Sequence, residues 1–138
     1  NTASGRGSLA VNALNEASAK FATSMGAYSK AAGGASLVAG KYNIEDTGTI
    51  TDQNTDARKY ALIIGNGTAD NARSNAATLD WDGNAVVAGK LTVGAAPTAD
   101  MDAATKKYVD DAVARIESLI NSITIENGVL TFRRGVNE

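Results

Sequence analysis

A 14-residue repeat near the N-terminus is the feature that most constrains what this chain can fold into. Turn-forming residues recur in register at Asn12, Gly26 and Gly40. Small residues recur with the same period at Ser8, Ala22 and Ser36. Between these two positions of each unit, residues two apart form the alternating pairs Leu9/Val11, Thr23/Met25 and Leu37/Ala39. Alternation inside so short a unit indicates two brief strands per coil, joined by Gly or Asn turns. A flexible linker has no reason to keep these positions in phase, so the pattern favours a solenoid.

The composition makes a large core in one chain improbable on physical grounds. Of the 138 residues, 5% are aromatic and 14 are glycine. Side chains this small bury too little apolar area to offset the entropy lost on ordering the chain. We therefore expect neighbouring copies to supply part of the burial.

Charge and residue content exclude several classes of function. The net charge of -2 gives no electrostatic reason to expect nucleic acid, and we predict no such partner. The chain has no Cys and no His, which removes thiol chemistry, disulfides, imidazole bases and the commonest zinc sites. No apolar run reaches the roughly 18 residues that span a bilayer, so we predict no membrane insertion. The chain starts at Asn1 rather than Met, and we expect it to be a segment of a longer protein.

Residues 4–40 resemble the head repeats of trimeric autotransporter adhesins. The units that carry the resemblance are Ser8–Asn12 and Ser36–Gly40. It implies a left-handed parallel β-roll in which three chains pack side by side.

The middle of the chain changes character. Residues 41–58 are rich in Thr, Asp, Asn and Gly, which predicts a connecting loop. Residues 59–97 predict a small β module. Its strands are expected at 60–64, in a hairpin over 77–87 around Asp82-Gly83, and at 90–93. We interpret Trp81, the only tryptophan, as a packing anchor beside the hairpin turn.

Residues 98–122 predict a helix, with Asp100 or Asp102 capping its N-terminus. Apolar residues follow a 4, 3, 4, 3 spacing at Val109, Val113, Ile116, Ile120 and Ile123. Ala112 and Leu119 widen this stripe, which favours three parallel helices in a coiled coil. Residues 123–138 predict a β-hairpin around Asn127-Gly128, which would close the end of the bundle.

A second resemblance covers more of the chain. Three segments look like modules of tail fibre and tail-tip proteins from phages and prophages of Gram-positive bacteria: 59–67, 79–84 and 88–94. The segment Ala103–Asp110 is similar to a helix-opening motif of phage tail fibres. Together they imply a trimeric fibre segment that presents host-binding surface.

We predict no catalytic, cofactor-binding or metal-binding residues. Residues 80–84 lack the spacing and the bidentate Glu of a calcium-binding EF-hand. Asp110 and Asp111 point about 100° apart on a helix, so they cannot share one substrate atom and are interpreted as a solvated face. The pair Arg133-Arg134 is interpreted as solubilising.

The sequence therefore predicts a mostly β protein with a C-terminal helix. The fold class is a homotrimeric fibre of left-handed parallel β-roll repeats (1–40), a loop, a small β module, a three-stranded parallel coiled coil and a terminal hairpin cap. The predicted function is structural and adhesive: a non-enzymatic segment of a viral tail fibre, outside the cell on the virion tail. Its expected partners are two further copies, other tail or fibre modules, and a host surface glycan or protein.

The residues predicted to form the trimer core are Leu9, Val11, Met25, Leu37, Val109, Ala112, Val113, Ile116, Leu119, Ile120 and Ile123. Two alternatives stay open. One is a trimeric adhesin head on a bacterial cell surface, and the other is a tailspike that cleaves glycans.

Overall fold

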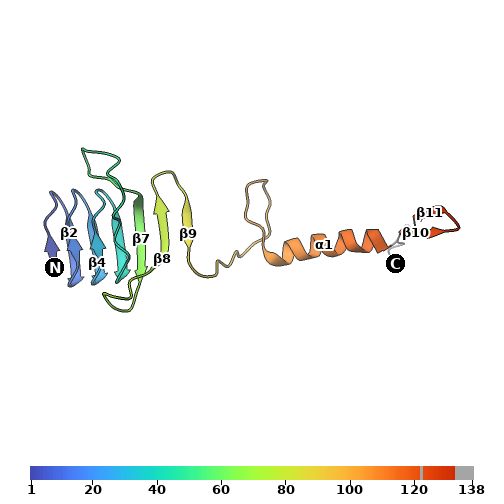
Figure 1. The fold of residues 1–138 in the computed structure, drawn as a ribbon, viewed down its shortest axis with the longest axis horizontal. Helices are drawn as coiled ribbons and strands as arrows, with labels where there is room; N and C mark the ends of the chain where they lie inside the picture. Colours follow the sequence, from blue (N-terminus) through green and yellow to red (C-terminus); the bar gives the residue numbers. More distant parts are fainter. Residues whose placement is uncertain (122, 133–138) are drawn as a thin grey trace. The chain divides into compact units, whose positions relative to one another are not determined.

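The computed structural model describes residues 1–121 and 123–132 (Figure 1). The chain divides into two compact units, Asn1–Lys90 and a second that begins at Leu91. The first contains two β-sheets. The second contains one helix and a β-hairpin.

Three coils open the first unit, and each contributes one strand to each sheet. The short strands run parallel in the order β1 (Thr2–Ala3), β3 (Glu16–Ala17) and β5 (Lys30–Ala31). The longer strands are β2 (Leu9–Ala13), β4 (Thr23–Ala27) and β6 (Leu37–Lys41), also parallel. Leu9 pairs with Thr23, and Thr23 with Leu37. Paired residues on adjacent coils are therefore 14 residues apart, which is the period of the sequence repeat.

The sheet of longer strands continues beyond the coils. It adds β7 (Tyr60–Asn66), β8 (Asn75–Asp80) and β9 (Ala85–Val87), in the order β2-β4-β6-β7-β8-β9 (Figure 1). β7 is parallel to β6, whereas β8 and β9 are antiparallel to their neighbours. The hairpin expected over 77–87 is the β8–β9 pair.

The interior between the two sheets is narrow because its side chains are small. Register places Ala10, Ser24, Val38 and Ile63 in one row across the longer strands. The buried apolar cluster consists of Ala17, Ala19, Ala22, Ala31, Val38 and Ile63. Four of its six members are alanine, so packing in this unit depends on close approach of backbones.

Polar side chains complete the interior. Asn15, Ser29 and Asn43 follow the same period and are all buried. Asn43 accepts a hydrogen bond from the Lys30 amide at 2.7 Å through Oδ1, and donates to the Lys30 carbonyl at 3.0 Å through Nδ2. Because buried polar groups cost free energy unless they are paired, these bonds fix how the coils stack.

Glycine is required where neighbouring coils approach most closely. Gly26 has φ of 119°, and a Cβ atom on it would lie 1.8 Å from the carbonyl oxygen of Gly40. Gly40 itself has φ of 96°. Both positions therefore need a residue without a side chain.

The fold class predicted from the sequence is wrong, and its first error is the parallel β-roll. After the three coils, the next strand pairs Leu37 with Leu62, a separation of 25 residues rather than 14. The longer connection and the antiparallel strands that follow turn the sheet into a mixed one. Within residues 1–121 and 123–132 there is no extended β-roll.

The second unit contains α1 (Lys106–Asn121), β10 (Ile123–Glu126) and β11 (Val129–Phe132). β10 and β11 pair antiparallel, with Glu126 opposite Val129 across the turn. Residues 90–93, expected as a strand, form none.

The predicted helix cap is also wrong. Thr105 caps α1, because its hydroxyl oxygen accepts a hydrogen bond from the Tyr108 amide at 3.1 Å. Asp102 instead accepts hydrogen bonds from the amides of Thr98 and Ala99, at 2.8 and 2.9 Å. These bonds stabilise a turn before the helix, so the helix begins at Lys106 rather than near residue 98.

The coiled coil is the second error in the predicted fold class. α1 has 16 residues, and no second helix packs on it in the described part of the chain. A helix of this length carries about two heptads, which is marginal for association in water. The division of the chain into five segments stays a prediction.

Candidate functional site

One corner of the coils is built from Leu14, Tyr28 and Tyr42, which are spaced by one repeat. All three lie in the left-handed region, with φ of 53°, 56° and 43°. The rings of Tyr28 and Tyr42 stack with centroids 4.6 Å apart and planes inclined by 8°. Burial raises the pKa of the Tyr42 phenol above its ordinary value, and the neighbouring Tyr28 raises it further. The corner thus presents one stacked pair of tyrosine rings.

Arg73 fastens the β7–β8 connection onto this corner. Its guanidinium lies 5.6 Å from the Tyr42 ring centroid and donates to the carbonyls of Tyr28 and Asn43 at 2.9 and 3.1 Å. It also pairs with Asp70. The Arg73 side chain is only 17% exposed, so its role is to stabilise the packing of the β7–β8 connection.

Lys30 sits between two carboxylates on the adjacent wall. Its ammonium lies 3.9 Å from Glu16 and 3.8 Å from Glu45. Glu16 and Lys30 are register partners in β3 and β5. Exposed pairs of this kind contribute little to stability, but they balance charge along the wall.

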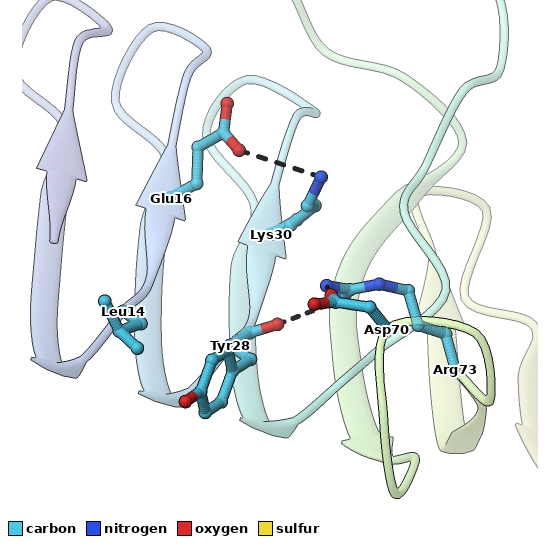
Figure 2. Close-up of a pocket in the computed structure, with 6 residues that line it drawn as sticks. All are labelled: Leu14, Glu16, Tyr28, Lys30, Asp70 and Arg73. Atoms are coloured by element: carbon cyan, nitrogen blue, oxygen red, sulfur yellow. Dashed lines mark hydrogen bonds and ion pairs between the residues drawn. The ribbon is translucent and has the colours of Figure 1, made fainter.

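These groups surround an open depression of about 570 Å³, which we call the Tyr28 depression. Figure 2 shows its lining residues: Leu14, Glu16, Tyr28, Lys30, Asp70 and Arg73. Each cation faces a carboxylate, so the depression can offer hydrogen bonds but little net charge. Tyr28, Tyr42 and Arg73 were not among the site residues predicted from the sequence. The repeat itself, which aligns Leu14, Tyr28 and Tyr42, was the signal available.

A second depression of about 420 Å³, which we call the Trp81 depression, lies beside the β8–β9 hairpin. Its lining residues are Gly48, Thr49, Thr51, Arg58, Lys59, Asp80, Trp81 and Asp82. Trp81 is 49% exposed, so it lies outside the buried core. The interpretation of Trp81 as a packing anchor beside the turn stays a prediction, and the exposed part of the side chain lines this depression.

The turn that carries Trp81 is held by one carboxylate. Asp80 accepts hydrogen bonds from the amides of Asp82 and Asn84 at 3.0 and 2.8 Å, and from the Asn84 side chain. The hydrogen bonds from Asn84 lower the pKa of Asp80 below its ordinary value. Asp80 therefore stabilises the turn, because both of its carboxylate oxygens accept hydrogen bonds within it.

The other charged residues discussed above form no binding site among the described residues. Asp110 pairs with Lys106, and Asp111 with Lys107 at 2.7 Å, each on the exposed surface of α1. Across residues 1–121 and 123–132, no cluster of three or more Asp and Glu side chains could hold a metal ion. Arg133-Arg134 lies outside the described residues.

The outward face of the six-stranded sheet is apolar except at Thr23. Register aligns one row across the six strands: Leu9, Thr23, Leu37, Leu62, Leu79 and Ala85. A second row runs beside it: Val11, Met25, Ala39, Ile64, Ala77 and Val87. We call these two rows the outward face. Alternate residues of a strand share one side of a sheet, so both rows lie on the side opposite Val38 and Ile63.

The residues predicted as trimer core are divided between the two units. Leu9, Val11, Met25 and Leu37 belong to the outward face, with exposures of 53%, 36%, 39% and 39%. Those on α1 are also exposed, namely Val109, Ala112, Val113, Ile116, Leu119 and Ile120. Ile123 begins β10 and is exposed as well. None of the eleven belongs to the buried cluster, and their role in a trimer stays a prediction.

Comparison with known proteins identifies no family for this chain. No protein-family model, no curated protein and no solved structure matches this chain. Over the residues that the structure describes, no helix has the length and hydropathy that a membrane crossing needs.

Proposed function

We propose that this chain is a structural and adhesive segment of a trimeric viral tail fibre, which contributes to attachment at the host-cell surface. The outward face is the observation that carries this proposal. Its expected partners are two further copies, adjoining tail or fibre modules, and a surface glycan or protein of the host. The segment would then lie outside the cell on the virion tail.

The outward face favours association between copies because of its chemistry. Large apolar side chains lie outside, whereas the interior holds mainly alanine and serine. Each large aliphatic side chain that leaves water contributes about 1.5–3 kcal/mol. Monomeric proteins rarely expose large contiguous apolar patches. A second copy can pack against the outward face without forming ion pairs, because neither row contains a charged residue.

The adhesive part of the proposal rests on the loops. The coils form a stiff support, and both depressions lie where connections leave the sheets. Binding residues accumulate on exposed loops that a rigid scaffold positions. The connection 42–59 is such a loop, and Asp46 fixes it by accepting hydrogen bonds from the amides of Gly48 and Tyr60 at 3.0 and 2.9 Å.

Light scattering coupled to size exclusion tests the assembly. We expect the mass of three chains at about 50 µM protein. Met25→Lys and Leu37→Lys place a charge on the outward face, and each should weaken association at least about tenfold. Ser18→Lys is the matched control, because Ser18 is exposed outside that face. A folded wild-type monomer at this concentration would contradict the proposal.

A further inference from the structure

We propose that the Trp81 depression is a binding site for a short neutral saccharide. The depression is lined by the half-exposed indole, by hydroxyl groups and by charges of both signs. The inference deepens the proposed adhesive role and rests on it, because it names the class of surface molecule recognised and the place where it binds.

The first wall is a preorganised aromatic surface. Trp81 belongs to the β8–β9 turn, where Gly83 adopts φ of 86° and the Asp80 carboxylate binds the amides of Asp82 and Asn84. A turn fixed in this way loses little conformational freedom on binding. Half of the Trp81 surface is already available to a ligand.

The second wall is equally constrained. Thr49 and Thr51 come from the 42–59 connection. Arg58 ties that connection to the coils, because it donates to the Ala32 carbonyl at 3.0 Å and to the Gly48 carbonyl. The two walls therefore come from separate, rigid parts of the same unit.

The chemistry of the walls matches a sugar ring. A pyranose has one face of C–H groups, which carry small positive charges, and a rim of hydroxyls. An aromatic ring has a negative face that attracts such C–H groups. Thr49 and Asp82 line the same depression, where a hydroxyl and a carboxylate can bind the sugar rim. The Thr51 hydroxyl donates to the Ala57 carbonyl at 3.1 Å, so toward a ligand it can only accept. A volume of about 420 Å³ lies within the range of small-molecule sites.

Charge balance favours a neutral ligand over an anionic polymer. Arg58 and Lys59 are matched by Asp80 and Asp82. Lys59 is also engaged, because its ammonium lies 5.0 Å from the Tyr60 ring centroid. The hydrogen bond with Tyr60 raises the pKa of Lys59 above its ordinary value. No surplus of positive charge remains at this depression to hold phosphate groups.

The Tyr28 depression is the weaker candidate for the same ligand. One face of its Tyr28 ring is covered by Tyr42, and its two cations are each paired with carboxylates. Its polar groups therefore bind one another.

Because Trp81 is the only tryptophan, its fluorescence reports on this depression alone. The full chain is titrated separately with chitotriose, cellotriose and maltotriose. We expect a saturable emission change with at least one of them, with Kd of about 1 mM, as for a shallow site. The change should persist in about 0.5 M NaCl, because no ion pair with the ligand is involved.

Calorimetry on variants locates the site independently of fluorescence. Trp81→Ala should weaken binding at least about tenfold, and Thr49→Val about threefold, since it removes a hydroxyl but keeps the side-chain shape. Tyr108→Ala is the matched control: Tyr108 is 49% exposed, like Trp81, but lies on α1. It should bind as the wild type does.

Three results would overturn the inference. They are no response to any of the three sugars by the folded chain, wild-type affinity in Trp81→Ala, or binding only of poly(glycerol phosphate) that is lost in high salt. None of them affects the measured mass of the assembly. Failure of the sugar site is thereby distinguished from failure of the proposed fibre role.

Discussion

The side chains of Asn15 and Ser29 are hydrogen-bonded to each other inside the coils. Asn15 Oδ1 accepts from the Ser29 hydroxyl at 2.7 Å and from the Ser29 amide at 3.0 Å. Asn15 Nδ2 donates to the carbonyls of Gly26, at 2.9 Å, and Val11. One amide side chain therefore satisfies groups on two successive coils. The same position in the neighbouring repeats is occupied by Ser29 and Asn43, so the polar ladder is part of the repeat.

Asn15→Ala should lower the free energy of unfolding by about 3 kcal/mol, because it leaves several buried polar groups without partners. Urea denaturation followed by circular dichroism measures the change. Asn54→Ala, at an exposed loop position, should stay within about 0.5 kcal/mol of the wild type. Equal stability of the two variants would show that the ladder does not hold the coils together.

Gly26→Ala should destabilise the first unit by about 3 kcal/mol or more, because the new methyl group would collide with the Gly40 carbonyl in an already left-handed conformation. Gly89→Ala is the control. A Cβ atom there meets nothing within 4 Å, and the change should be neutral or slightly stabilising. Thermal melts of both variants should differ clearly, and coincident melts would refute the close approach of the coils.

The β8–β9 turn should weaken in acid. The pKa of Asp80 is lowered in the folded protein, so its contribution is complete above the pKa of the unfolded chain. It is lost as pH falls through the lower, folded pKa. Carbon-13 NMR titration of the carboxyl group should report this low pKa, and Asn84→Ala should move it back toward the usual value of Asp. An unchanged titration in that variant would mean that Asn84 is not the cause.

Thr105→Ala should reduce the helix content of the second unit, since loss of an N-cap costs about 1 kcal/mol. Thr105→Ser should preserve it. Asp102→Ala should leave the helix itself intact, because that carboxylate bonds to residues 98 and 99. Far-ultraviolet circular dichroism compares the three. If Asp102→Ala lost as much helix as Thr105→Ala, the cap would have been assigned to the wrong residue.

Part of this structure was predictable from local sequence. The 14-residue period sets the pairing of Leu9 with Thr23 and of Thr23 with Leu37, because turn residues and alternation repeat together. Asp82-Gly83 likewise marks a tight turn by its chemistry alone, and β8 and β9 pair around it. Such signals need no knowledge of distant residues.

The tertiary structure decided what the period and the turns left open. The sequence by itself determined the repeat, the brief strands and the absence of thiol and imidazole chemistry. It did not determine that β7 would pair in parallel with β6 and continue the sheet of the coils, because that pairing joins strands separated by the 42–59 connection. Nor did it place Trp81 at a depression or Arg73 over Tyr42. These contacts join residues far apart in the chain, and their free energies depend on packing that no local pattern encodes.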